Sequence, residues 1–418
     1  MVHPRMTGLQ RSMQPRPRVP RWLWILGPGL MVMLADTDAG SVITASQSGA
    51  RWGYSLLALE VVLVPVLYLV MELTVRLGIA TGKGHAQLIR ERFGARWASI
   101  SIGALLVSAF GALVTEFAGV AGVGQLFGLP PALTVLPAAG LLVILVVSGG
   151  YRRVELVGIA LGLFELAFVA AALLAHPSAH AIAAGVATQP LGRPGYLKLV
   201  AANVGAVVMP WMFFYQQGAV VDKGLTERDL RSARIDTALG ALLTQVIMGA
   251  VLVATAVSFH GRSGSLQSVG AIAHALAPLL GSSTSRVLLA LGVLGAALVA
   301  SIVVSLAAAW AVAEVAGRPR SLNDGLRRAP LFYGLYAGAV ALGAVLVLVS
   351  HSLVRLAIDV EVVNALLLPL VLGMLIVLAH LVLPAPHALR RVRRVAVSFA
   401  TIVVALVGII WLGFAFGL

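Results

Sequence analysis

Two long apolar stretches of the sequence are each interrupted by residues that break helices and carry ligand atoms. The first interruption is residues 35–41 (ADTDAGS), inside an apolar run that starts near Trp22. The second is residues 205–211 (GAVVMPW), inside a run that starts near Tyr196. In a bilayer, backbone groups that leave a helix must be satisfied by protein, water or an ion. Paired breaks in the two halves of a chain therefore indicate a transport site near the middle of the membrane.

The first break carries an aspartate about midway through its apolar run. A carboxylate at this depth is costly and is by default a functional residue, so we predict that Asp38 binds a cation. The following Ala-Gly-Ser can turn backbone carbonyls and the Ser41 hydroxyl toward an ion, and hard divalent cations prefer such oxygen ligands. The alternative role for these acids is helix capping, which we expect of Asp36 more than of Asp38, although both roles can coexist.

The second break contains a proline. Pro210 lacks a backbone N–H and disfavours helical geometry in the residue before it, which frees carbonyls near Ala206 and Val207. The thioether of Met209 lies next to these carbonyls, and a thioether is a soft ligand that favours transition metals. That Met209 only fills a gap in the core is an equally open alternative.

The composition requires a membrane protein. Of 418 residues, 60% are hydrophobic and 11% are charged, which no soluble domain could bury. Because a helical span needs about 20 apolar residues, we expect an all-α polytopic protein with eleven spans, without a sizeable soluble domain. These spans are residues 22–45, 54–80, 98–127, 131–149, 154–175, 196–221, 235–259, 285–316, 331–350, 353–383 and 395–417.

The net charge of +14 is explained by membrane topology. Most of the 30 lysines and arginines fall in alternate connecting segments, beginning with the basic tail of residues 1–21. This positive-inside pattern predicts a cytoplasmic N-terminus and an outside C-terminus, and nucleic-acid binding is not needed to explain the charge. The first apolar run is too long for a signal peptide. We expect a bacterial inner (cytoplasmic) membrane and a monomer.

Several chemistries lack the residues they need. Without cysteine there are no disulfides or thiolate ligands. Histidines lie mostly near span ends, which disfavours a zinc site, and no motif for nucleotide hydrolysis or peptidase chemistry is present. We therefore expect neither an enzyme nor a resident cofactor. Among the remaining acids within spans, Glu116 and Glu361 lie deepest and should face a cavity or a partner.

These residues resemble the family of NRAMP divalent-metal transporters. The resemblance is carried by residues 27–29 (GPG), 38–41 (DAGS), 53–57 (GYSLL) and 77–83 (LGIATGK), and by residues 205–210 (GAVVMP). Weaker similarity continues through Glu314 to residues 364–369 (NALLLP), so it covers most of the chain.

The resemblance implies a LeuT-type fold, with two inverted repeats of five helices plus one extra helix. The repeats would be residues 22–175 and 196–383 and the extra helix 395–417, together forming one transmembrane domain of residues 22–418. By resemblance, the metal would bind between the broken first and sixth helices. The implied ligands are Asp38, Ser41 in place of the family's asparagine, the Ala206 carbonyl, Met209 and, at the position of a tenth-helix polar ligand, Glu361.

The departures from the family pattern concern proton movement. The histidine expected after the sixth-helix Met-Pro is Trp211, and the third-helix acidic pair keeps Glu116 but has Leu113 in place of the aspartate. We expect these three positions to lie on the pathway or at a gate. The pattern resembles the NRAMP-related magnesium transporter branch, which implies Mg²⁺ or Mn²⁺ as the transported substrate without proton coupling.

The sequence thus predicts an importer of Mg²⁺ and/or Mn²⁺ that works by alternating access in the lipid bilayer. One alternative is a proton-coupled transition-metal importer of the NRAMP type. A second is a sodium/amino-acid symporter with the same fold, which Asp38 opposes because it would repel a substrate carboxylate. A third is a membrane scaffold without transport activity, which the absence of a soluble sensing domain disfavours.

Overall fold

The computed structural model describes residues 27–261, 266, 268–349 and 353–384, and these are helical with no strand among them. The first half contains α3 (Pro28–Asp36), α4 (Ala39–Trp52), α5 (Leu57–Thr81), α6 (His85–Phe93), α7 (Ala95–Leu126), α8 (Pro131–Ser148), α9 (Tyr151–Gly162), the 3₁₀ turn η1 (Leu163–Glu165), α10 (Leu166–Leu174) and α11 (Ala179–Ala187). The second half contains α12 (Pro194–Val207), α13 (Pro210–Asp222), η2 (Glu227–Asp229), α14 (Leu230–Phe259), α15 (Val269–Leu280), α16 (Ser282–Val315), α17 (Pro330–Val349) and α18 (Leu353–Val382).

Nine helices or helix pairs of the described residues are long and apolar enough to cross a membrane. The first predicted span, which is divided into halves of 9 and 14 residues, is not among these nine. With that broken span included, the first ten predicted spans are present in the predicted order. The eleventh, residues 395–417, and the tail of residues 1–21 lie outside the described residues.

Both predicted breaks are present, and each is only two residues long. Thr37 and Asp38 separate α3 from α4, and Asp38 is extended with φ −66° and ψ 172°. Val208 and Met209 separate α12 from α13 and are also extended. Pro210 is the first residue of α13, where its missing N–H leaves no helical hydrogen bond unmade.

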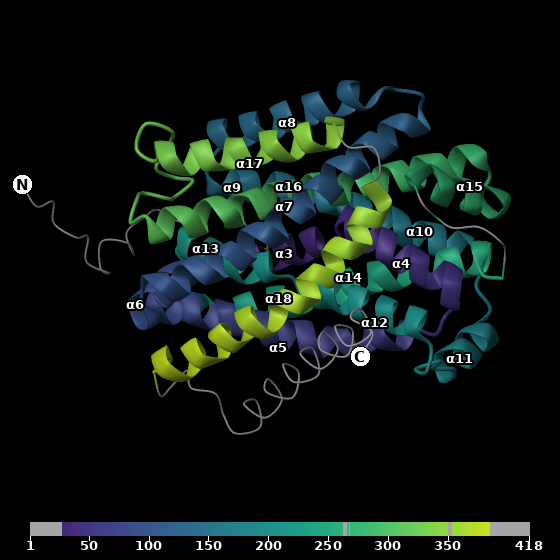
Figure 1. Ribbon diagram of the computed structural model, residues 1–418, viewed down its shortest axis with the longest axis horizontal. Helices are drawn as coiled ribbons and strands as arrows, with labels where there is room; N and C mark the ends of the chain where they lie inside the picture. Colours follow the sequence, from purple (N-terminus) through teal and green to yellow (C-terminus); the bar gives the residue numbers. More distant parts are fainter. Residues whose placement is uncertain (1–26, 262–265, 267, 350–352, 385–418) are drawn as a thin grey trace, which may run out of the picture.

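The two halves repeat one order of elements. Each begins with a broken span, continues with a long helix, a short helix and a helix of more than 30 residues, and ends with two further spans. Because five spans separate equivalent elements, the second copy is inverted in the membrane relative to the first. The short helices α6 and α15 accordingly lie at opposite ends of the bundle (Figure 1).

The sequence did not predict three short helices, α6, α11 and α15, nor the 3₁₀ turn within the fifth span. The short helices lie between spans, where their lengths of 9 to 12 residues fall below what a hydropathy window detects. The 3₁₀ turn interrupts the fifth span at Glu165, between α9 and α10. A stretch of 3₁₀ geometry within a longer helix often marks a functional position.

The first half-helix is held at its start by a distant carboxylate. Asp236 of α14 accepts hydrogen bonds from the backbone N–H groups of Gly27, Gly29 and Leu30, at 3.0, 2.8 and 3.2 Å. These are N–H groups that a helix start leaves without intrahelical partners. Asp236 therefore caps α3 from another helix and fixes it against α14.

Candidate metal site

Asp38 lies at the centre of the first break and is completely buried. It is the N-cap of α4, and its Oδ1 accepts a hydrogen bond of 2.7 Å from the Ser41 backbone N–H. Its Oδ2 has no hydrogen-bond partner. The expectation that Asp36 rather than Asp38 caps the second half-helix is wrong, because only Asp38 has the extended conformation that aims a side chain back at the helix start. One oxygen of Asp38 thus caps α4 while the other is left for a ligand.

Ser41 joins the two breaks. Its hydroxyl donates a 3.1 Å hydrogen bond to the carbonyl of Ala206, in the last turn of α12. Both residues are completely buried. Two predicted ligands from opposite halves of the sequence are therefore in direct contact, and the Ala206 oxygen lies beside the first break.

Glu361 of α18 reaches the first break at Gly40. A Cβ atom at Gly40 would lie 2.5 Å from Glu361 Oε1 and 3.3 Å from Asp38 Oδ1. Glu361 Oε1 is buried without a hydrogen-bond partner, whereas Oε2 accepts from Asn364 Nδ2 at 3.0 Å. The Asn364 Oδ1 in turn accepts from the Ser108 hydroxyl at 2.6 Å. Glu361 is thus held from behind and presents one free oxygen close to Asp38.

Glu116 also contacts the first break, whereas Leu113 packs in the apolar core. Glu116 Oε2 accepts a 3.1 Å hydrogen bond from the Ala39 backbone N–H, and its Oε1 accepts from the Thr115 hydroxyl at 3.3 Å. Leu113, one turn earlier on α7, packs toward α17, where a Cβ atom at Gly343 would lie 3.0 Å from the Leu113 Cβ. Glu116 therefore ties α7 to the start of α4, while Leu113 belongs to the apolar core.

Met209 lies in the second break, and its thioether is in contact with Trp211. The indole Nε1–H of Trp211 donates to Met209 Sδ at 3.2 Å, and both side chains are completely buried. The Met209 backbone N–H donates to Met212 Sδ at 3.4 Å. The sulfur predicted as a soft ligand is therefore engaged by the side chain that replaces the family's histidine.

No positive side chain balances these carboxylates within the described part of the chain. The ion pairs formed there, Glu72–Arg76, Glu72–Arg234, Glu155–Arg152, Glu155–Lys223, Glu314–Arg320, Glu91–Lys83 and Asp359–Lys198, use none of Asp38, Glu116 and Glu361. The described part of the chain contains no group of three or more His, Asp or Glu side chains that could together hold a metal ion. A cation here would bind to a mixed set of carboxylate, carbonyl, hydroxyl and water oxygens.

Some residues of the site gave no signal in the sequence. Thr115, Asn364 and Ser108 support the acids, but hydroxyl and amide side chains are too common in helices to be singled out. Gly205 allows α12 to approach the Glu361 backbone, since a Cβ atom there would overlap its carbonyl oxygen. Its position next to Ala206 in the break was the one available hint.

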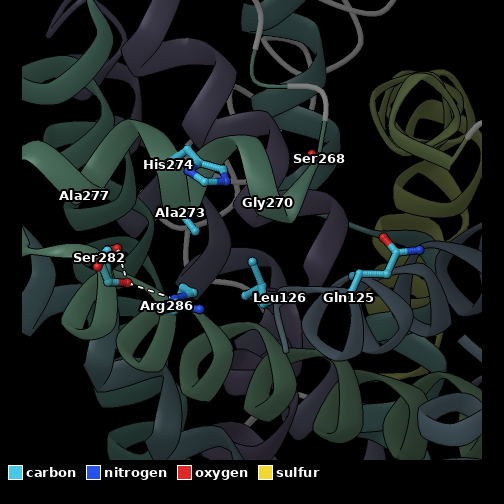
Figure 2. A pocket seen from close by; sticks show the side chains of 11 residues that line it. Gln125, Leu126, Ser268, Gly270, Ala273, His274, Ala277, Ser282 and Arg286 are labelled. Atoms are coloured by element: carbon cyan, nitrogen blue, oxygen red, sulfur yellow. Dashed lines mark hydrogen bonds between the residues drawn. The ribbon is translucent and has the colours of Figure 1, made fainter. Parts of the chain in front are cut away.

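A separate cavity of about 400 Å³ lies between the end of α7, α15 and the start of α16, away from both breaks. Figure 2 shows Gln125, His274 and Arg286 around it. His274 and Arg286 are exposed and no acid lines the cavity, so it offers a cation no balancing charge. We do not assign it to the metal site.

The geometry agrees with solved structures of the same fold. The chain superposes on a manganese transporter from Eremococcus coleocola with a TM-score of 0.81 and 20% identity, over 96% of this chain and 89% of the other. It superposes on Mhp1, a nucleobase-cation-symport-1 family transporter, with a TM-score of 0.60 and 15% identity over 92% and 90% of the two chains. The predicted LeuT-type fold is confirmed. The boundaries of the two repeats remain predictions.

Curated sequences give the family. The chain is 32% identical to a divalent metal cation transporter MntH from Brucella suis, over 69% of this chain and 66% of that one. It is 30% identical to MntH 1 from Pseudomonas aeruginosa, over 77% and 78%. The matches to the Brucella suis protein and to an MntH from Verminephrobacter eiseniae span just under two thirds of those relatives. The family described as natural resistance-associated macrophage protein-like matches residues 29–413, and with this coverage the chain belongs to the Nramp family.

Proposed function

We propose that this protein carries Mg²⁺ and/or Mn²⁺ into the cell by alternating access, without moving a proton. The observation that carries the proposal is a pair of carboxylates next to Gly40 at the first break, Asp38 and Glu361, each of which has one oxygen without a partner. Uncompensated buried charges are strongly destabilising, so two of them side by side require a cation or protons. Relatives named as divalent metal cation transporters support the cation.

The ligand set favours a hard ion. Asp38, Glu361, the Ser41 hydroxyl and the Ala206 carbonyl supply oxygens, the ligands that Mg²⁺ and Mn²⁺ accept, with water completing the shell. Met209 is the one soft ligand. Because the Trp211 N–H donates to its sulfur, one sulfur lone pair is engaged, which weakens the preference for softer metals.

Charge alone can drive import without protons. With an inside-negative potential, each elementary charge gains about 2.3 kcal/mol per 100 mV, and a dication gains twice that. Leu113 and Trp211 cannot exchange protons, and Leu113 faces the core instead of the site. We propose Glu116 as a gating residue, because its contact with the Ala39 N–H can form or break as α4 moves relative to α7.

The proposed setting is a bacterial inner membrane with a cytoplasmic N-terminus, an outside C-terminus and a monomeric transporter in contact with lipid. The Lys and Arg distribution supports this orientation. In this mechanism the broken helices, α3–α4 and α12–α13, would move relative to the remaining helices of the bundle.

The test is uptake by proteoliposomes that hold a fixed membrane potential. We expect Mn²⁺ and Mg²⁺ uptake that grows with inside-negative potential, is lost in Asp38→Asn and leaves a trapped pH dye unchanged. Metal-driven acidification would show proton coupling and reject the uncoupled mechanism. Na⁺-driven amino-acid uptake, with no metal flux, would reject metal transport altogether.

A further inference from the structure

We propose a second cation site on the other side of the first break, formed by the carboxylates of Asp36 and Glu165 and the hydroxyls of Thr37 and Thr244. It would take a hard divalent cation, bound at the same time as the ion at Asp38. This inference deepens the proposed function and rests on it. The two sites use different helices, since α7, α12 and α18 contribute to the first, and α14 and the fifth span to the second.

α14 packs along α3, with contacts that recur once per helical turn up to the first break. Gly29 lies against Thr237, where an added Cβ would be 2.8 Å from the Thr237 N. One turn on, a Cβ at Gly240 would be 2.7 Å from Met33 Cγ. One further turn brings Thr244 to the break, where its hydroxyl lies 2.7 Å from the Thr37 Oγ1 and 3.3 Å from Asp36 Oδ2.

The fifth span approaches the same point from another side. A Cβ atom at Gly162 would lie 2.7 Å from the Leu34 Cβ, so α9 and α3 are in close contact one turn before the break. The next turn of the fifth span is the 3₁₀ turn that ends at Glu165. Glu165 therefore lies near Thr37 and interacts electrostatically with Asp36 and Asp38. Three elements therefore converge on the first break with oxygen-bearing side chains.

The carboxylates at this point have free oxygens. Asp36 Oδ1 and both oxygens of Glu165 are buried without any hydrogen-bond partner, and the two residues are at most 1% exposed. No ion pair in the described part of the chain includes either acid. Several acids elsewhere in the bundle have partners. Glu72 and Glu155 pair with basic residues, and Asp236 accepts three backbone hydrogen bonds.

Charge balance argues for two ions. Six buried carboxylates lie around the first break without a positive partner in the described part of the chain, at positions 36, 38, 60, 116, 165 and 361. One dication would leave four of these acids to be neutralised by protons in a low-dielectric interior, whereas two dications leave two. Carboxylate and hydroxyl oxygens select hard ions such as Mg²⁺ and Mn²⁺, and no sulfur or imidazole ligand is placed in the second site.

The experiment counts Mn²⁺ bound to the purified full-length protein by calorimetry and by electron paramagnetic resonance. We expect two Mn²⁺ per wild-type chain and one per Glu165→Gln chain, with Mg²⁺ competing at both sites. Glu314→Gln is the control, because Glu314 is a buried acid that pairs with Arg320 at the end of α16. It should still bind two. In Asp38→Asn, the ion at Glu165 should remain.

The outcomes separate this inference from the proposed function. One Mn²⁺ in wild type that depends on Asp38 and is unaffected by Glu165→Gln overturns the second site and leaves the first intact. No bound Mn²⁺ in wild type overturns both proposals. Should Glu165→Gln fail to fold, pulsed measurement of the coupling between two Mn²⁺ ions in wild type decides, and a single uncoupled ion counts against the second site.

Discussion

At the scale of single residues, the site depends on which oxygens and sulfurs are already used by the protein. Asp38 uses one oxygen as a helix cap and keeps the other free, and Glu361 divides its two oxygens in the same way. Met209 is the opposite case, because its sulfur already accepts the Trp211 N–H. Ligand selectivity is therefore set as much by the neighbours of each ligand as by its type.

Trp211→Phe should increase the preference of the first site for soft metal ions. The substitution keeps an aromatic ring but removes the N–H that engages Met209 Sδ, and a hydrogen bond of this kind contributes about 0.5–1.5 kcal/mol. We expect affinity for Cd²⁺ to rise by roughly threefold to tenfold relative to Mg²⁺. Calorimetry with both ions measures this ratio. The double variant with Met209→Ala should show no such gain, and an equal change for both ions would contradict the explanation.

Gly40→Ala should remove metal binding while leaving the protein folded. The new methyl group would lie 2.5 Å from Glu361 Oε1 and must displace that carboxylate, although no backbone atom is close. We expect Mn²⁺ uptake to fall at least tenfold with a normal thermal unfolding temperature. Gly103→Ala on α7, where nothing lies within 4 Å of the added Cβ, serves as the control and should retain full uptake.

At the scale of helices, the two breaks divide two spans into halves that are fixed independently. α3 is held by Asp236, α4 is capped by Asp38 and contacted by Glu116, and α12 lies against Glu361. The starts of α3 and α4 are satisfied by the side chains of Asp236 and Asp38, so the first break is stable without a continuous backbone ladder. The motion of one half-helix relative to the bundle can then be tested by substituting the side chain that holds it.

Asp236→Ala should loosen α3. It leaves three backbone N–H groups of the helix start without their acceptor, and loss of a cap alone costs about 1–2 kcal/mol. We expect a lower unfolding temperature and faster hydrogen exchange confined to residues 27–36. Asp359→Ala, which removes an exposed acid paired with Lys198, should change neither.

His85 of α6 should make stability depend on pH. It is completely buried outside the spans, and burial lowers its pKa to about 4, although Gln217 Oε1 lies 3.0 Å from Nδ1. In the unfolded state a histidine has its ordinary pKa of about 6.5. Between pH 4 and pH 6.5 the native state therefore binds fewer protons than the unfolded state. Stability is full above pH ~6.5 and falls by up to about 3 kcal/mol as the pH drops to 4.

Thermal unfolding across this pH range measures the effect. His85→Asn should flatten that part of the profile, because the side chain no longer titrates. The exposed His274 provides the comparison, and His274→Gln should leave the wild-type slope in place. A slope that persists unchanged in His85→Asn would assign it to other groups.

At the scale of the whole molecule, the repeated and inverted order of helices places two breaks side by side in the middle of the bundle. The basic segments determine how this bundle inserts. The chain has no cysteine, so a single introduced cysteine reports its own side of the membrane. We expect Arg328→Cys to react with an impermeant maleimide only from the cytoplasmic side and Gly192→Cys only from the outside. If each cysteine reacted only from the opposite side, the predicted orientation would be wrong.

The sequence by itself predicted the first ten spans and both breaks, which the structure contains, and it supplied the residues that we propose for the first site. These follow from local physics, since apolar length decides insertion and a proline or aspartate within such a length decides where a helix stops. Only the tertiary structure decided which acid caps α4, that Trp211 engages Met209 and that Leu113 faces α17. It also brought Glu165 to Asp36, because the distance between two side chains depends on how separate helices pack in register, and no local pattern records that.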